Sequence, residues 1–209
     1  IQMGLRSERV AYDGEHYVLP RPGGEGKPIR LSQPPAPNLP IYLATLGPKA
    51  MELTGELADG WIGTSFVPEH ADVFMAPLQR GLEKSSRSLS DLDIQVGGSL
   101  EISEDVERLI EARRPAMAFT LGGMGSAQTN FYNDAFSRAG YEAEAKKVQS
   151  LWVDGKKEEA IRAVPDEMVL KTNLIGTREM VIERIRAYAA VGVTTLRVST
   201  TGTNWKERT

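Results

Sequence analysis

The sequence predicts an α/β fold built on a parallel sheet. Two observations lead to this prediction: short apolar runs alternate with amphipathic helical patterns, and the turns between them are short. A strand–helix–strand–helix rhythm of this kind requires parallel strands joined by crossover helices. Such sheets are usually doubly wound or closed into an eight-stranded (β/α)8 barrel, and the rhythm alone leaves both architectures open.

Composition removes several classes of function. The 209 residues carry 25 Lys+Arg against 28 Asp+Glu, a formal net charge of −3, which argues against a nucleic-acid surface. Without cysteine there is no thiolate metal site or cysteine nucleophile, and two histidines cannot build a zinc site of several imidazoles. No apolar run approaches the roughly 18 residues of a membrane span, and no signal peptide opens the chain. We therefore expect a cytoplasmic protein that does not bind a membrane.

The N-terminal region predicts a hairpin followed by a linker. Two short runs rich in valine and tyrosine flank Asp13-Gly14 within residues 1–19. This pair favours a two-residue type I′ turn, in which both central residues need a positive φ. Residues 20–40 are rich in proline and glycine, which predicts an extended linker.

Residues 41–102 predict a βαβαβ unit. Its strands are expected at 41–46, 60–66 and 92–102. One helix begins at Pro48 and stops before Gly60, and a second begins at Pro68 with a kink at Pro77. The first helix is expected to turn one face inward, formed by Ala50, Met51, Leu57 and Ala58.

Residues 103–170 predict a helical region. It is expected to start at Ser103, Glu104 and Asp105, to be interrupted at Pro115, and to break at Gly122–Gly125. Further helices are expected at 127–138, 141–154 and 156–163.

Residues 171–209 predict the last helix and strand. Thr177 caps the helix, which ends at Gly192, and the strand covers 193–200. The expected inner stripe of this helix is Val181, Ile182, Ile185, Tyr188 and Ala189. Four core strands are too few for a barrel of eight strands and about 250 residues. If the parent fold is a barrel, we expect these residues to be its second half and part of a longer chain, with no closing helix after Thr200.

The turn at 44–49 is the best local candidate for a site. It follows a buried parallel strand, where α/β folds place ligands, and a helix start with the Thr45 hydroxyl and the Lys49 charge could hold a phosphate. Pro48 removes one donor, and taken alone a plain βα turn is the simpler interpretation.

For the other candidate residues, the pattern favours structural roles. Gly122–Gly125 reads as a helix break, His16 and His70 as solvated, Glu56 and Asp59 as a helix surface, and 130–134 as a cavity wall or a core with a cap.

Residues 40–61 (PIYLATLGPKAMELTGELADGW) resemble a signature segment of the luciferase-like monooxygenase superfamily, most strongly its branch dependent on coenzyme F420. The resemblance extends to ERVAYDGEHY at 8–17, to GGMG and NFYND at 122–134, and to LIGTRE and GVTTLRV at 174–198. It therefore covers nearly the whole chain, although each of the shorter segments is weak by itself.

This resemblance implies a TIM barrel with an inserted helical region. It implies one luciferase-like domain over 1–209 that is incomplete at its N-terminus, and a flavin or deazaflavin held at the carboxyl ends of the strands. Ala44, Thr45, Leu46 and Gly47 would contact the cofactor, with Lys49 a weaker extension. The half of the barrel that holds the acid/base groups in this family is absent here, so no catalytic residue is assigned.

Three functions follow as hypotheses. The leading one is an oxidoreductase that transfers a hydride between coenzyme F420 and a small organic substrate, acting as a homodimer. An FMN-dependent monooxygenase of the same fold is the close alternative. The third is a non-catalytic remnant that serves as a binding or dimerisation module.

Overall fold

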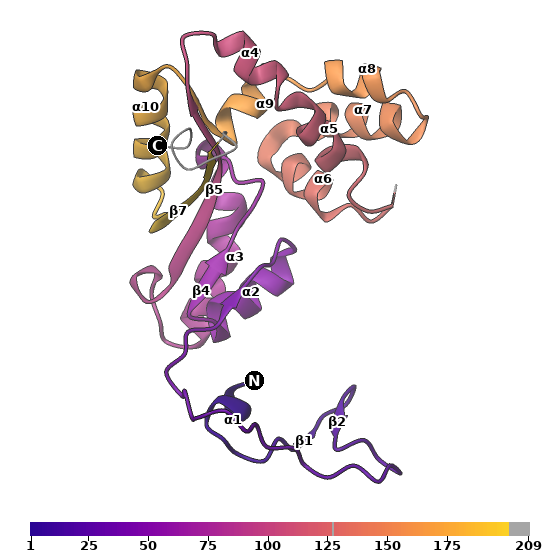
Figure 1. The fold of residues 1–209 in the computed structure, drawn as a ribbon, viewed down its shortest axis with the longest axis vertical. Coiled ribbons are helices and arrows are strands. Elements are labelled where there is room, and N and C mark those ends of the chain that lie inside the picture. Colours follow the sequence, from indigo (N-terminus) through magenta and orange to yellow (C-terminus); the bar gives the residue numbers. More distant parts are fainter. Residues whose placement is uncertain (127, 201–209) are drawn as a thin grey trace. The chain divides into compact units, whose positions relative to one another are not determined.

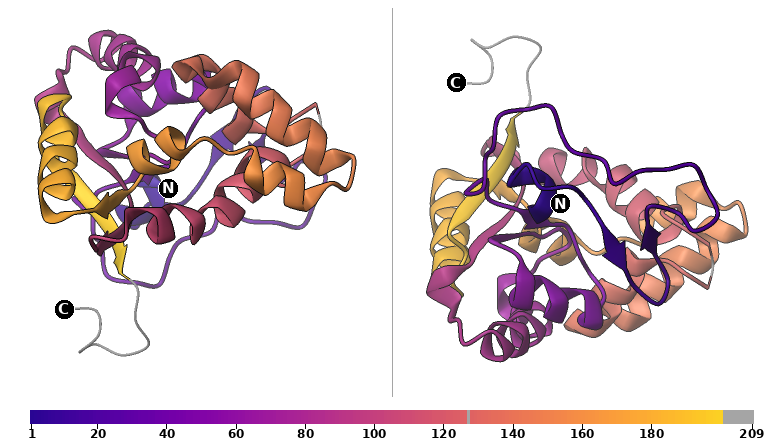
Figure 2. Two further views of the ribbon diagram at one scale, coloured as in Figure 1. Left: turned by 90° about the horizontal axis from the view of Figure 1, so that it is seen from above. Right: turned by 90° about the horizontal axis from the view of Figure 1, so that it is seen from below.

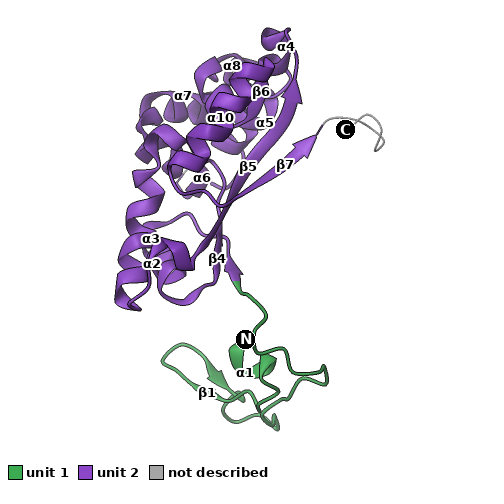
Figure 3. Ribbon diagram, turned by 90° about the vertical axis from the view of Figure 1, so that its left-hand side faces the viewer, with its two compact units in different colours: residues 1–41 green, residues 42–209 purple. Residues whose placement is uncertain are grey.

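The computed structural model describes residues 1–126 and 128–200, which fall into two compact units divided between Ile41 and Tyr42 (Figure 3). The predictions for 127 and for the chain beyond Thr200 lie outside the described residues.

The first unit contains a short helix and the predicted hairpin. Helix α1 (Gln2–Leu5) precedes strands β1 (Tyr12–Asp13) and β2 (Val18–Leu19), which pair antiparallel. The hairpin is confirmed, but its two-residue turn is wrong: the amide of Gly14 donates to the carbonyl of Tyr17 at 3.0 Å, so the reversal takes residues 14–17. Gly14 does not have a positive φ, which a type I′ turn would need.

The second unit is organised around a parallel five-stranded sheet (Figure 1). Strand β3 (Tyr42–Leu43) pairs with β4 (Gly60–Ile62), β4 with β5 (Asp93–Ile102), and β5 with β7 (Thr195–Thr200), and every pair is parallel. The α/β prediction is confirmed. Strands β3 and β4 are shorter than predicted for local reasons. The carbonyl of Thr45 accepts the indole N–H of Trp61 at 2.9 Å instead of pairing with a strand, and Ser65 has a φ of +55°.

The fifth strand, β6 (Leu174–Gly176), was not predicted from the sequence. It pairs only with the last three residues of β5, whereas β4 pairs with the first three, 93–95. Three residues are too few to show a period of two, which is why the pattern gave no sign of it. Between these two short ladders, 96–99 of β5 has no strand partner on this edge, although the amide of Ser99 donates to the side-chain carbonyl of Asn173 at 2.9 Å.

Helices α2 (Pro48–Leu57), α3 (Asp72–Lys84) and α10 (Arg178–Ala190) share one apolar core with the sheet, centred on Trp61, Phe74 and Ile94. Short 3-10 turns precede and follow α3, at η1 (Pro68–His70) and η2 (Leu89–Asp91). The predicted stripes are only partly right, since Ala50, Leu57, Ile185 and Ala189 are exposed. Helix α2 instead packs closely against α3. This contact needs glycine at position 55, because a Cβ there would lie 2.1 Å from the carbonyl oxygen of Leu78.

The helical insertion has a core of its own and forms a separate group beside the sheet (Figures 1 and 2). Its helices are α4 (Val106–Glu111), α5 (Arg114–Gly122), α6 (Phe131–Phe136), the π-helical turn η3 (Ser137–Tyr141), α7 (Glu142–Val153), α8 (Lys157–Arg162) and α9 (Asp166–Lys171). The predicted interruption near Pro115 is confirmed, and α9 was missed. Gly122 acts as a packing position, since a Cβ there would lie 2.4 Å from that of Trp152.

Candidate functional site

The predicted turn after β3 opens onto a groove of about 550 Å³. Leu46 and Gly47 line it, together with Pro48 at the first position of α2. Its other wall comes from α6, η3 and α7 of the helical insertion. The groove-lining residues of that wall are Phe131, Asn133, Asp134, Ser137, Arg138, Glu142, Lys146 and Gln149.

The four predicted site residues have different surroundings. Ala44 is exposed and does not line the groove. The Thr45 hydroxyl shares a hydrogen bond of 2.8 Å with the hydroxyl of Thr54, so its side chain is directed to helix α2. Leu46 and Gly47 lie on the groove wall, and a Cβ on Gly47 would meet no atom within 4 Å. Lys49 is exposed in the first turn of α2.

Arg138 connects the two walls of the groove. Its guanidinium donates to the carbonyl of Leu46 at 2.8 Å, across 92 residues of sequence. It also lies 6.0 Å from the centroid of the Phe74 ring. Burial lowers the pKa of Arg138, against the opposing effect of Asp134, although an arginine stays charged. The residue belongs to η3, the kink between α6 and α7, where Gly140 has a φ of +89°.

Positively charged or polarised groups and apolar side chains both line the groove. The first amides of α2 have no acceptor within the helix and point toward its N-terminal end, where the helix dipole is positive. Lys146 forms an ion pair with Glu142, which lowers the pKa of that carboxyl. Leu46, Pro48 and Phe131 supply the apolar surface. The arrangement suits an elongated ligand with one anionic group, and its volume lies in the usual range for cofactor pockets.

One wall of the groove was predicted from the sequence, and most of the other was not. The sequence predicts either a cavity wall or a capped core at 130–134, and the segment is both. Asn130 is buried and caps α6, while Phe131 lies on the groove. Arg138 and Lys146 were missed. A signal for them existed in the polar residues 142, 146 and 149, which share one face of α7, and in 134 and 138, which are four apart before the kink at Gly140.

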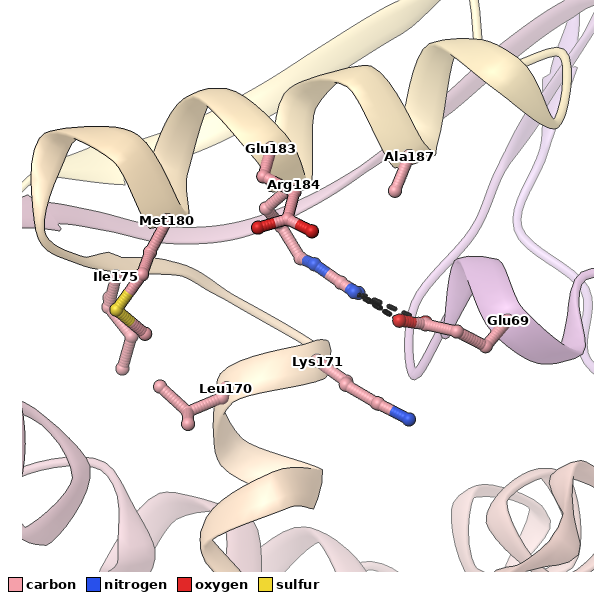
Figure 4. Close-up of a pocket in the computed structure, with 8 residues that line it drawn as sticks. All are labelled: Glu69, Leu170, Lys171, Ile175, Met180, Glu183, Arg184 and Ala187. Atoms are coloured by element: carbon pink, nitrogen blue, oxygen red, sulfur yellow. Dashed lines mark hydrogen bonds and ion pairs between the residues drawn. The ribbon is translucent and has the colours of Figure 1, made fainter.

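A second pocket, of about 230 Å³, lies among η1, α9, β6 and α10 (Figure 4). Arg184 points to Glu69 and pairs with it, with N–O distances between 2.6 and 3.0 Å. Burial would raise the pKa of Glu69, but the Arg184 guanidinium outweighs it and the pKa is lowered. The two charges neutralise each other, and the ion pair joins α10 to η1. None of the predicted site residues lines the pocket.

The two histidines lie outside the groove. His16 is exposed, and His70 packs edge-on against the ring of Tyr141 at 5.7 Å. No cluster of three or more potential metal-binding side chains occurs among the described residues. In the same part of the chain, no helix is long and apolar enough to cross a membrane.

Comparison with known proteins gives one family. The model of the luciferase-like monooxygenase family matches residues 1–195. A Mycobacterium tuberculosis protein, assigned provisionally by its name to the coenzyme F420-dependent oxidoreductases, is 31% identical over 205 residues, which cover 95% of this chain and 59% of that protein. The 5,10-methylenetetrahydromethanopterin reductase of Archaeoglobus fulgidus is 28% identical over 93% of this chain and 55% of its own.

The fold agrees with a solved structure. The coenzyme F420-dependent tetrahydromethanopterin reductase from Methanopyrus kandleri superposes with a TM-score of 0.74 at 22% identity, over 99% of this chain and 56% of that one. The chain thus spans a little over half the length of these relatives. Its parallel strands form about half of a TIM barrel.

Proposed function

Because this chain belongs to the luciferase-like monooxygenase family, we propose that it forms the cofactor-holding part of an F420-dependent oxidoreductase. The observation that carries the proposal is the groove that opens at Leu46 and Gly47, directly after a parallel strand. Ligands in α/β folds bind outside the carboxyl ends of the strands, and the Mycobacterium tuberculosis and Methanopyrus kandleri relatives are F420-dependent by name.

Each wall of the groove has a part in holding the cofactor. Gly47 has open space where a side chain would stand, so a phosphate can approach the first amides of α2 closely. Arg138 supplies a positive charge that its hydrogen bond to Leu46 keeps in place. Phe131, which is 63% exposed, offers an aromatic surface to a flat ring or an apolar chain.

When bound, F420 supplies the hydride chemistry, and the protein supplies binding and orientation. The acceptor or donor would be a small organic substrate. The residues of this chain would exclude water from one side of the cofactor and fix its anionic end. No residue of the chain is assigned as acid or base.

Titration of the complete gene product with F420, followed by the fluorescence of the deazaflavin, tests the proposal. Gly47→Val should weaken F420 binding at least tenfold, since the added side chain enters the groove while its extended backbone suits valine. Arg138→Met should weaken it comparably. Arg186→Met, an exposed arginine on α10 outside the groove, should leave it unchanged.

Parallel titration with FMN separates the alternatives. Tighter binding of FMN than of F420 would replace the proposal by an FMN-dependent monooxygenase. Binding of neither would favour a non-catalytic binding or dimerisation module. The homodimer and the cytoplasmic location expected from the sequence stay predictions.

A further inference from the structure

A third cavity, of about 190 Å³, lies where β4 and β5 meet the helical insertion. Its floor is Gly97–Ser99 of β5, which pairs with β7 on one edge and is covered by neither β4 nor β6 on the other, and its roof is helix α5. Thr64 and Ser65 enter it from the loop that follows β4. The cavity is therefore at the carboxyl end of the sheet, the same end as the groove.

The lining of this cavity offers unused hydroxyl groups. The side chains of Thr64, Ser65 and Ser99 form no hydrogen bond with any described protein group, whereas Thr120 and Thr172 donate to carbonyls of their own helical turns. Ser65 also has a φ of +55°, a strained conformation for a residue with a side chain. Thr64 is exposed and Ser65 and Ser99 are half-buried, so a ligand in the cavity can reach all three hydroxyls.

The arginine that lines the cavity is held by a carboxylate outside it, Glu101, which also pairs with Arg108 at 2.9 Å. Arg113 is the one charged side chain in the described lining, and its guanidinium pairs with Glu101 at 2.7 Å and donates to the carbonyl of Leu109 at 3.2 Å. Its remaining Nε–H is buried and has no partner. The positive charge is thus committed, and an incoming anion would have to displace the Glu101 carboxylate.

We propose that this cavity binds the uncharged, oxygen-bearing end of the substrate, a hydroxyl or carbonyl group, and that it discriminates against phosphate and carboxylate. The assignment of the ligand as substrate rests on the proposed function. The binding preference itself rests on the three free hydroxyls and on the neutralised arginine.

Solution NMR on the complete gene product tests the preference, with glycerol and inorganic phosphate as probes. Glycerol should shift the amide signals of Thr64 and Ser99, and phosphate should bind at least tenfold more weakly. Thr64→Val and Ser99→Ala should each weaken glycerol binding by up to about tenfold, the value of one or two hydrogen bonds. Thr120→Val is the matched control, since its hydroxyl is already satisfied, and should change little.

A charge variant makes the test sharper. Glu101→Gln releases the Arg113 charge, so phosphate affinity should rise about tenfold or more. The double variant Glu101→Gln with Arg113→Gln should lose that gain. Phosphate binding as tight as glycerol in the natural protein, or no perturbation by either probe, would overturn the inference. The F420 titration is independent of these probes, so a failure of cofactor binding removes the proposed function and leaves the cavity result standing.

Discussion

Asp93, the first residue of β5, fastens three strands at their amino-terminal ends. Its carboxylate accepts the hydroxyl of Tyr42 on β3 at 2.8 Å and the amide of Gln95 at 2.8 Å, and it also accepts the hydroxyls of Thr194 and Thr195 at the start of β7. Burial alone would raise the pKa of Asp93, but these hydrogen bonds outweigh it and lower the pKa to about 2. This end of the sheet lies opposite the groove, where a polar cluster serves stability.

We expect Asp93→Asn to lower the free energy of unfolding by about 1–3 kcal/mol at pH 7. A lowered pKa stabilises the fold fully above the unfolded value of 3.8, and this contribution disappears as the pH falls toward 2. The difference between natural and variant protein should therefore shrink between pH 4 and about pH 2, as measured by urea unfolding. Asp154→Asn, on an exposed position after α7, should change stability by less than about 0.5 kcal/mol at either pH. A difference that stays constant down to pH 2 would contradict this account.

Single residues also show which parts of the candidate site can be predicted from the sequence. Leu46 and Gly47 were predictable because strand end, glycine and proline stand together and mark a βα turn. Arg138 was not, because its role depends on a contact to Leu46 that only the tertiary structure creates. Unused hydroxyls such as those of Thr64 and Ser99 carry no sequence signal at all.

Among the elements, helix α6 depends on one buried asparagine. Asn130 is 2% exposed, and its carbonyl oxygen accepts the amides of Tyr132 and Asn133 at 3.1 and 3.0 Å. Its amide nitrogen donates to the carbonyls of Thr120 and Leu121 at the end of α5. One side chain therefore caps α6 and satisfies the C-terminal carbonyls of α5.

Asn130→Asp should lower the free energy of unfolding by about 2–4 kcal/mol at pH 7, although aspartate is itself a good N-cap. The introduced carboxylate keeps the acceptor but places a second oxygen against two carbonyls in a buried place. Burial raises the pKa of such a group, so the loss should diminish at lower pH as it becomes protonated and can donate. Thermal unfolding at pH 5 and pH 8 measures this. Thr177→Asp, at the half-buried cap of α10, is the control and should cost little at both pH values. Equal losses for Asn130→Asp at both pH values would contradict the explanation.

At the level of elements, sequence predicted the long, strongly patterned segments and only some of the short ones. Helices α2, α3, α7 and α10 and strand β5 were found, and so were the short β3, β4 and α8. Strand β6 and helix α9 were missed, because three to six residues show no reliable period. The sequence also did not predict which way each helix faces. The contact between Gly55 and Leu78 that turns α2 toward α3 is a tertiary effect.

The whole second unit has two cores, one of sheet with α2, α3 and α10, and one within the helical insertion. The groove lies between elements of both, since α2 belongs to the first core and α7 to the second. Composition and rhythm predicted the parallel sheet and the insertion separately. The groove could not be predicted, because it exists only where the two are packed together.

A cofactor in this groove should therefore stabilise both cores at once. At a hundredfold excess over its Kd, a ligand that binds only the folded state adds about 2.7 kcal/mol to the opening free energy of the parts that it holds. In hydrogen exchange with F420 on the complete gene product, we expect slower exchange in the first turn of α2 and in α6 and α7. The amides of α10, which line no part of the groove, should gain less. Arg138→Met removes the hydrogen bond between the walls, so protection should become weaker in α6 and α7 even at saturating F420. Protection confined to one core would mean that the ligand lies on a single wall, and would contradict a site built from both.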